Sequence, residues 1–297
     1  MMGEQTLPQV KISMEGAHAK GCNLCGGTER KLLQQVGATQ VVECRCGLVY
    51  VTPTPPRAVI EQVYQDEYYE AWREQARARQ RIWQRRWDGV KQLKNGPGRL
   101  LDVGCGDATF LRLAKAGGWN IVGTEFSARA VAAAADCDVR QGEVWEARLL
   151  ADSCDVVTSW HVIEHVSDPR RMVQELFRVL RPGGRLVLAT PNLHDYLFRA
   201  AYVLGRFRLP ALYEEDEREL HLFNFSASTL TRLVQSVGFM DVTVGFDRGA
   251  AAVPSKQIVD AIAYGWYRLT GLNWGIGMEL VARKPAAGER LRHEVAA

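Results

Sequence analysis

The sequence lacks the features that mark several classes of protein. It has no uninterrupted apolar stretch of about 18 residues, the length at which a helix crosses a bilayer, so we expect no membrane span. Residues 1–16 contain no basic segment followed by an apolar run, so we expect no signal peptide and a cytoplasmic protein. No internal repeat is visible. A large charge of one sign is also missing. The formal net charge is +3, so composition alone does not indicate a nucleic-acid or membrane-surface protein.

The residues that are present are typical of a globular protein. The chain has 297 residues, of which 47% are hydrophobic and 24% are charged. This length has room for one large domain and a small one. There are seven cysteines. In a reducing compartment, clustered cysteines are first interpreted as metal ligands.

Four cysteines form two pairs close in the sequence. Cys22 and Cys25 belong to a C-x-x-C, Cys44 and Cys46 belong to a C-x-C, and each pair is followed by glycine. Paired thiolates can close a tetrahedral zinc site, and the glycines let backbone amides turn toward the sulfur atoms. The segment between the pairs, residues 31–43, has strand-like apolar residues and predicts a hairpin. About 50 residues bury little core, so a structural zinc ion would help this module to fold.

The alternative is four ordinary reduced cysteines. Zinc ribbons often bind nucleic acid, but few basic residues surround these knuckles, so we favour a structural role. The basic residues are Lys20, Arg30, Lys31 and Arg45. The proline-rich segment 51–56 then predicts a stiff linker.

Residues 57–88 contain no proline or glycine and predict a basic aromatic helix. Six arginines lie between Arg73 and Arg86. The aromatic residues are Tyr64, Tyr68, Tyr69, Trp72, Trp83 and Trp87. The favoured interpretation is an amphipathic helix that packs its aromatic side chains on the main domain. A second interpretation, compatible with the first, is a lid whose arginine meets an anionic substrate group.

An apolar strand at residues 99–103 runs into a glycine turn, Gly104 to Gly106, and then into a helical pattern. This is the nucleotide-binding strand–turn–helix of a doubly wound α/β fold. A dinucleotide site requires a third glycine and a helix N-terminus that is free to meet pyrophosphate, whereas here Thr109 replaces that glycine. Asp102 and Asp107 would repel pyrophosphate but suit a cationic ligand. The electrostatics therefore favour S-adenosylmethionine, which carries a sulfonium and an ammonium group.

Further acidic residues lie at the ends of the following strands. Glu125 ends the second predicted strand about 20 residues after the glycine turn, where an acid can bridge a ribose diol. Glu143 follows the third strand. Ser127 and Asp168 are predicted N-caps, and Asp168 is followed by proline at the first helical position.

The stretch 159–165 reads SWHVIEH and matches H-x-x-E-H, a pattern of zinc proteases. A protease would need His161 and His165 on one helix and a further ligand downstream. Here a predicted strand, 155–160, runs directly into the motif, and the next helix begins only after Asp168. We therefore predict a strand-to-helix turn above a ligand cleft. The metalloprotease remains a third hypothesis, which zinc bound at the two histidines would support.

Together these segments resemble class I S-adenosylmethionine-dependent methyltransferases. The matching segments are LLDVGCGDATFL (100–111), GTEFS (123–127), QGE (141–143), DVVTSWHVIEHVSDP (155–169) and LRPGGRLVLATPN (180–192). Residues 221–239 resemble one subgroup, whose members often carry an N-terminal cysteine ribbon ending in a phrase like CGLVY, here 46–50. The resemblance covers nearly the whole chain. It departs from the family at Ala108, where a glycine is usual, and at the C-x-C, where C-x-x-C is usual.

The resemblance implies a doubly wound, seven-stranded Rossmann-like sheet whose last strand is antiparallel, with 242–246 and 278–283 as its last two strands. It also implies the site residues. For the cofactor these are Asp102, Gly104, Cys105, Gly106, Glu125, Phe126, Glu143 and His161. The candidate bases are His165 and His221. A purely structural hydrogen-bonding role stays open for each histidine. Related quinone-type enzymes hold a divalent metal at this turn, but here His161 replaces an acid.

The predicted function is methyl transfer from S-adenosylmethionine to a small molecule, with O-methylation favoured over C- or N-methylation. The alternative is a nucleic-acid or protein adaptor built on a degenerate scaffold; we expect no nucleic-acid partner. The predicted segments are a zinc-ribbon-like module (1–56), a helical lid (57–95), the methyltransferase domain (96–285) with an inserted helical cap (193–220), and a flexible tail (286–297). An amphipathic helix is also predicted over 256–269.

Overall fold

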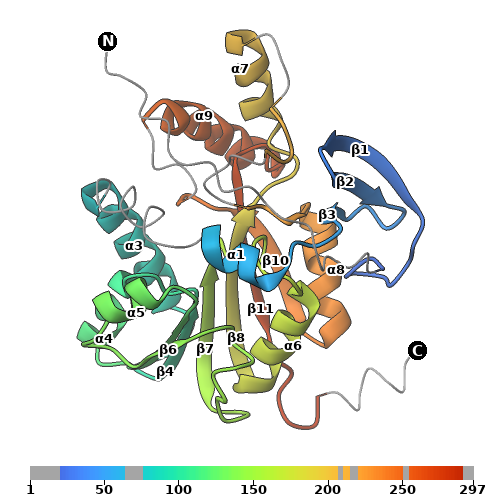
Figure 1. The fold of residues 1–297 in the computed structure, drawn as a ribbon. Coiled ribbons are helices and arrows are strands. Elements are labelled where there is room, and N and C mark those ends of the chain that lie inside the picture. The colour runs from blue at the N-terminus through green and yellow to red at the C-terminus, as the bar shows by residue number, and fades with distance from the viewer. Residues whose placement is uncertain (1–20, 64–75, 207–209, 215–219, 250–253, 290–297) are drawn as a thin grey trace.

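The computed structural model describes residues 21–63, 76–206, 210–214, 220–249 and 254–289. Some sequence predictions concern residues outside these ranges. They are the middle of the basic aromatic helix with its four aromatic residues from Tyr64 to Trp72, the acidic run 215–219 and the end of the tail. Within the described ranges, the chain forms two sheets, one of seven strands and one of four (Figure 1).

The seven-stranded sheet has the order β10-β11-β8-β7-β4-β5-β6. Its strands are β4 (Arg99–Val103), β5 (Asn120–Glu125), β6 (Val139–Gln141), β7 (Cys154–Trp160), β8 (Leu180–Pro191), β10 (Met240–Phe246) and β11 (Gly277–Arg283). The first five are parallel to one another, and β11 runs antiparallel to both β8 and β10. The predicted fold and its antiparallel last strand are confirmed. Strand order reverses between β4 and β7, which is where open α/β sheets bind ligands.

Helices cover both faces of this sheet (Figure 1). The helices of the described residues are α1 (Arg57–Val63), α3 (Ala76–Val90), α4 (Thr109–Ala116), α5 (Ala128–Ala133), α6 (Pro169–Val179), α7 (Tyr196–Arg206), α8 (Ala227–Val237) and α9 (Pro254–Thr270), of which α7 and α9 lie beyond the carboxyl edge of the sheet. Neighbouring residues of β7 pack on opposite faces of the sheet. Val156 joins the apolar cluster that includes Trp87 of α3 and Leu111 of α4, whereas Val157 joins the cluster that includes Leu176 of α6. A strand buried on both faces is the expected result of a parallel sheet covered by helices.

Helix starts follow the capping residues of the sequence. The Ser127 side chain accepts a hydrogen bond from the Ala130 amide, and the Asp168 side chain accepts one from the Arg171 amide. Both predicted N-caps are confirmed. Ser226 and Thr229 form a reciprocal capping box at the start of α8, which satisfies backbone groups that a helix end otherwise leaves unpaired.

The N-terminal module forms the second sheet, with strand order β1-β2-β3-β9. Its own strands are β1 (Arg30–Val36), β2 (Thr39–Cys44) and β3 (Val49–Thr52), so the predicted hairpin is confirmed. The fourth strand, β9 (Phe223–Asn224), comes from the other end of the chain and pairs with β3. The apolar residues of the module belong to the same buried cluster as those of α6 and α8. The module is therefore packed into the main domain, and the predicted domain boundaries stay a prediction.

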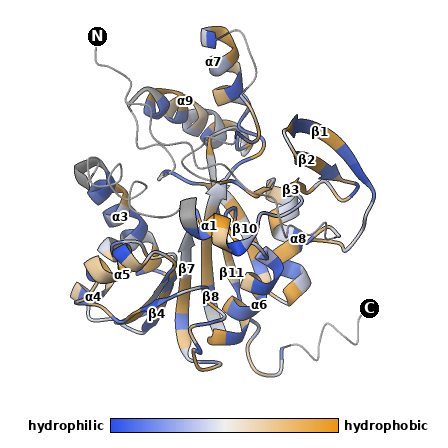
Figure 2. Cartoon of the chain, viewed as in Figure 1, coloured by the Kyte–Doolittle hydropathy of each residue, from blue (hydrophilic) through white to orange (hydrophobic). Residues whose placement is uncertain are grey.

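Helices α7 and α9 contact each other above the carboxyl edge of the sheet (Figure 1). Hydrophobic and hydrophilic residues alternate along both helices (Figure 2), the pattern of an amphipathic helix. The prediction of a helix over 256–269 is confirmed by α9. In the part of the chain that the structure describes, no helix is both long and apolar enough to cross a membrane.

Candidate functional site

The glycine turn after β4 is held tightly against the turn after β7. Gly104 has φ +69°, a conformation that favours glycine, and a Cβ atom at this position would lie 2.4 Å from Cγ2 of Val162. Ala108 is completely buried and also has positive φ, 62°, in the place where the family usually has glycine. The alanine side chain is therefore accommodated at this position, but the left-handed backbone conformation is unfavourable for a residue with a Cβ atom.

Glu125 ends β5, and its side chain links the glycine turn after β4 to the start of α5. Its carboxylate accepts hydrogen bonds from the backbone amides of Gly106 (2.9 Å) and Ser127 (2.8 Å), one on each oxygen. The side chain is buried. Each carboxylate oxygen has a second lone pair. Glu125 can therefore accept ligand hydroxyl groups while its position is fixed by the backbone.

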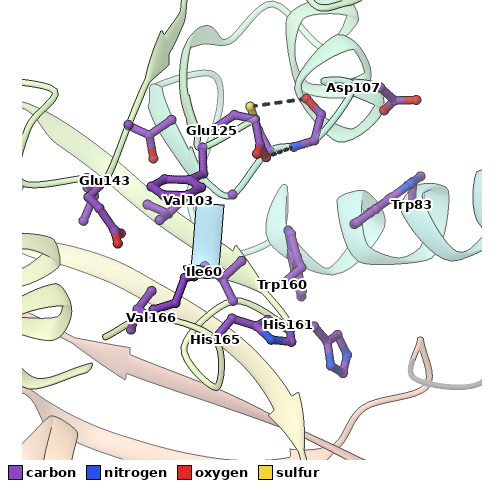
Figure 3. Close-up of a pocket in the computed structure, with 18 residues that line it drawn as sticks. Ile60, Trp83, Val103, Asp107, Glu125, Glu143, Trp160, His161, His165 and Val166 are labelled. Atoms are coloured by element: carbon purple, nitrogen blue, oxygen red, sulfur yellow. Dashed lines mark hydrogen bonds between the residues drawn. The ribbon is translucent and has the colours of Figure 1, made fainter. Parts of the chain in front are cut away.

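A cleft lies at the carboxyl ends of β4, β5 and β7 (Figure 3). The predicted cofactor residues that line it are Gly104, Cys105, Gly106, Glu125, Phe126, Glu143 and His161. Figure 3 shows Glu125 and Glu143 on one side of the cleft and Trp160, His161 and His165 on the other. Burial raises the pKa of Glu143 to about 7. The ends of three strands between Gly104 and His165 therefore build one concave surface.

Two helices of the predicted lid also contribute to this cleft. Ile60 of α1 and Trp83 of α3 both line it. The guanidinium carbon of Arg57 lies 5.5 Å from the ring centre of Phe126, a cation–π contact that holds α1 against the cleft. The same arginine pairs with Glu146. Both α1 and α3 therefore contribute a side chain to the lining of the cleft, and the lid stays a prediction.

Asp102 is not among the residues that line the cleft. It is buried behind the glycine turn, where the Thr158 hydroxyl donates a hydrogen bond to its carboxylate at 2.6 Å. Burial raises the pKa of Asp102 to about 7. Its position favours a role in fixing β4 against β7 over direct contact with a ligand.

His161 occupies a left-handed conformation, φ 57°, directly after β7. Its Nε2 donates to Oδ2 of Asp247 at 2.8 Å, and its Nδ1 lies 3.5 Å from Oε1 of Glu164. Burial opposes protonation, but these two carboxylates outweigh it and raise the pKa of His161 to about 9. The imidazole is therefore cationic near neutral pH, which makes it unsuited to act as a base.

The turn at 161–168 contains no helix. His161 and His165 therefore do not take the one-turn spacing on a helix that the protease motif needs. The group that can hold a metal ion at this turn is Glu164, His165 and His221, whose candidate ligand atoms all lie within 4.8 Å of one another. His161 is outside this group and faces Asp247 instead.

The two candidate bases come together from different segments. The rings of His165 and His221 have centres 4.9 Å apart. His165 Nδ1 donates to the Leu220 carbonyl at 2.9 Å, so this nitrogen carries the hydrogen and Nε2 is the acceptor in the neutral ring. His165 lines the first cleft, and His221 lines a second cavity next to it.

Trp83, Trp160 and His161 line both the cleft and the second cavity and form the wall between them. The second cavity extends from this wall to α7 and α9. Its charged lining residues are Arg79, Arg86, Glu164, Asp195, Arg199, Glu214 and Lys256. Its aromatic lining residues, besides the wall, are Phe198 and Tyr202. The inserted helical cap thus supplies part of the second cavity.

The four cysteines of the N-terminal module converge. Their sulfur atoms all lie within 4.8 Å of one another. Tetrahedral zinc–thiolate sites place sulfur atoms about 3.8 Å apart, from Zn–S bonds of about 2.3 Å. In each knuckle a glycine with positive φ closes a turn: Gly26 donates to the Cys22 carbonyl and Gly47 to the Cys44 carbonyl, both at 2.7 Å.

The first knuckle is attached to the start of α6. Asn23 Nδ2 donates to Asp168 Oδ1 at 3.1 Å, and the Arg170 guanidinium donates to the backbone carbonyls of Asn23 and Leu24. This surface of the module is occupied by the protein itself, which favours a structural role.

Three residues at the site, Ile60, Trp160 and Asp247, were not predicted from the sequence. A signal existed for two of them. Trp160 is the last residue of a predicted strand, and Asp247 directly follows another, the position at which Glu125 was recognised. Ile60 had no such signal, because only folding brings α1 over the cleft.

The profile of a family described as a methyltransferase domain matches residues 68–244. A probable S-adenosylmethionine-dependent methyltransferase of Mycolicibacterium smegmatis is 32% identical over 58% of this chain and 65% of its own length. A ubiquinone biosynthesis O-methyltransferase of Erwinia tasmaniensis is 32% identical over 42% of this chain and 56% of its own length. The chain therefore spans less than two thirds of each of these relatives.

Among solved structures, an S-adenosylmethionine-dependent methyltransferase of Archaeoglobus fulgidus is similar in fold. Its TM-score is 0.51 at 19% identity, and the match covers 73% of this chain and all of that one. At this identity the likeness concerns the fold.

Proposed function

The chain belongs to the methyltransferase-domain family, and we propose that it transfers a methyl group from S-adenosylmethionine to an oxygen atom of a small-molecule acceptor. The observation that carries this proposal is the cleft itself. It lies at the reversal of strand order, and it is lined by the glycine turn and by the Glu125 carboxylate, which two backbone amides fix beside that turn.

The cleft residues fit S-adenosylmethionine chemically. When bound, this cofactor supplies an electrophilic methyl carbon on a cationic sulfur. We assign the ribose hydroxyls to Glu125 and the adenine to the apolar and aromatic residues near Phe126, with Glu143 at the same end. Gly104 and Gly106 line the cleft with positive φ and without side chains, so the backbone of the turn can approach the rest of the cofactor closely. Asp102 is assigned an indirect role, since it supports the turn from behind.

The second cavity is the proposed acceptor site. Trp83, Trp160 and His161 line both it and the cleft, so an acceptor there would meet the cofactor where the two cavities adjoin. Positioning is the main contribution that a protein makes to methyl transfer.

We propose His221 as the base that takes the proton of an acceptor hydroxyl. It lines the acceptor cavity, and His165 beside it is held by the Leu220 carbonyl, with the two rings tilted at 43° and their centres 4.9 Å apart. His161 is excluded from this role because it is held as a cation by Asp247 and Glu164. A base is useful when the acceptor group must lose a proton, as a hydroxyl group does, so the position of His221 favours oxygen as the acceptor atom. The similarity to an O-methyltransferase supports this choice.

For the cysteine cluster we propose structural zinc. Four converging thiols in two knuckles provide the ligand set that zinc prefers. Since the cluster lies between β1, β2 and the start of α6, the ion would hold the module on the main domain. Its place is remote from the methyl-transfer step, and no step is assigned to it.

Equilibrium binding of S-adenosylmethionine to the purified chain, measured by titration calorimetry, tests the central proposal. The wild-type chain should bind. Glu125→Ala should weaken binding by roughly 10- to 100-fold, because a hydrogen bond to a charged group contributes about 1.5–3 kcal/mol. Asp136→Ala, which removes an exposed acid paired with Arg112, is the matched control and should bind normally. A wild-type chain that does not bind the cofactor would rule the proposal out.

The transfer itself is tested by mass spectrometry of a metabolite extract incubated with the chain and a methyl-labelled cofactor. A product that carries the label on oxygen supports O-methylation. A labelled carbon or nitrogen would retain the methyltransferase but overturn the oxygen assignment and the role of His221.

A further inference from the structure

Helix α9 presents an apolar face to solvent. Ile258, Ile262, Trp266 and Leu269 have 68%, 62%, 37% and 86% of their surface exposed, respectively. At about 100° per residue these four positions fall within an arc of about 80° on one side of the helix. Ala261 and Gly265, which flank this arc, are exposed as well. We call the four large residues the α9 stripe.

The opposite side of α9 is the one that packs on the protein. Asp260 and Ala263 are buried there, and Tyr264 and Tyr267 contact Phe246. The helix thus buries its only acid and exposes Ile258, Ile262 and Leu269, the reverse of an ordinary surface helix. Exposed contiguous apolar surface of this kind marks an interaction site.

Helix α7 beside it adds to the same surface. None of its residues is buried, and Leu204 is 78% exposed. The exposed charged side chains named here on α7 and α9 are all positive. Arg206, Lys256 and Arg268 are exposed, whereas Asp260 is the only acidic residue in either helix and is buried. The surface therefore combines aliphatic side chains, a tryptophan and positive charge.

We propose that the α7–α9 surface docks on an anionic lipid bilayer. A helix with an apolar stripe, a tryptophan and flanking cations lies in the plane of a membrane interface, and its affinity rises with negatively charged lipid. The positive charge of the α7–α9 surface argues against a second copy of the chain as its binding partner. An isologous interface would bring the same exposed arginines and lysine of two copies together, with no exposed acid from either helix to neutralise them.

The docking places the second cavity at the lipid surface. Lys256 is exposed near the start of α9 and also lines that cavity, together with Phe198 and Tyr202 of α7. The inference goes beyond the proposed methyl transfer and is independent of it, because vesicle binding is measured without any reaction.

Flotation with vesicles tests the proposal. The full chain should float with vesicles of phosphatidylglycerol and phosphatidylcholine and bind far less to phosphatidylcholine alone. Adding salt should weaken binding, since the attraction to anionic lipid is screened. The double variant Ile262→Ser with Leu269→Ser should lower the partition coefficient by roughly tenfold or more. Arg206→Gln with Arg268→Gln should lower it by at least about fivefold, on anionic vesicles only.

Leu150→Ser is the matched control. Leu150 is 72% exposed and lies between β6 and β7, away from α7 and α9, and its loss should leave flotation unchanged. Far-ultraviolet circular dichroism checks that every variant is folded. Binding of S-adenosylmethionine is measured separately, so that a failure of this proposal is distinguished from a failure of the one on methyl transfer. The proposal is overturned if the wild-type chain ignores anionic vesicles or if the stripe variant floats normally. It is also overturned if sedimentation shows a dimer that the stripe variant dissociates.

Discussion

Arg86 and Asp247, 161 residues apart in the sequence, form a buried ion pair in which Nη2 lies 3.0 Å from Oδ2. The guanidinium carbon also lies 4.5 Å from the ring centre of Trp160 and 5.0 Å from that of Trp83. Because Asp247 also accepts a hydrogen bond from His161, this pair links α3, the end of β10 and the turn after β7. It therefore fixes the wall between the cleft and the second cavity.

Loss of one partner should be costly. Asp247→Ala leaves the Arg86 guanidinium buried without its carboxylate, so the free energy of unfolding should fall by about 3–5 kcal/mol. Denaturant unfolding of the full chain measures this change. Asp152→Ala removes an exposed acid that pairs with Lys284 and should cost about 1 kcal/mol or less. Equal losses in the two variants would contradict the view that Asp247 fixes the wall.

His161 should make stability depend on pH. Its pKa in the folded chain, about 9, lies above the ordinary value of 6.5. The stabilisation from its protonation is therefore complete below pH 6.5 and is lost as the pH rises through about 9. The expected loss is roughly 1–3 kcal/mol. Urea unfolding of the wild-type chain and of His161→Gln at pH 6.5 and 9.5 isolates this contribution, and the variant should lose less stability over the interval.

The glycine turn should not accept a side chain at Gly104. A methyl group there would meet Val162 Cγ2 at 2.4 Å, so Gly104→Ala should push the turn after β7 away and weaken cofactor binding by about tenfold or more. Gly96→Ala is a matched control, since Gly96 also has positive φ, +77°, but a Cβ atom there has no neighbour within 4 Å. The control should bear only the backbone strain of about 1 kcal/mol and bind the cofactor normally.

Removal of the proposed base should affect turnover and leave cofactor affinity intact. With a labelled acceptor in hand, His221→Gln should lower kcat by roughly 10²–10⁴, the range of general-base catalysis. The dissociation constant of S-adenosylmethionine should stay unchanged. His194→Gln, an exposed histidine at the start of the cap, is the control. A full rate in His221→Gln would leave the histidine with a structural role.

The cysteine cluster should hold one zinc ion per chain, as measured by elemental analysis. Cys22→Ser should lose the ion and lower the melting temperature, because a structural zinc site contributes its binding energy to folding. Cys137→Ser, a half-buried cysteine outside the cluster, should keep the ion. A zinc-free wild-type chain with unchanged stability after chelation would refute the assignment.

Most of the fold could be predicted from local sequence patterns. The alternation of apolar strands, glycine turns and capped helices indicated the order of the elements, and Ser127 and Asp168 start helices as predicted. The glycine turn and Glu125 were also identified because ligand sites in such sheets lie at strand ends, which the sequence marks directly. Asp102 shows the limit of this rule. It also lies at a strand end, but its side chain points to Thr158 behind the turn.

The sequence by itself therefore determined the element order, the strand-end acids and the cysteine pairs, since each depends on residues only a few positions apart. Tertiary structure alone decided three other features. It paired β3 with β9, it brought Arg86 and Asp247 to His161, and it turned the apolar side of α9 outward. The reason is physical: hydrophobic periodicity predicts that a helix has an apolar face, but only the packing of distant segments determines whether that face meets the core or the solvent.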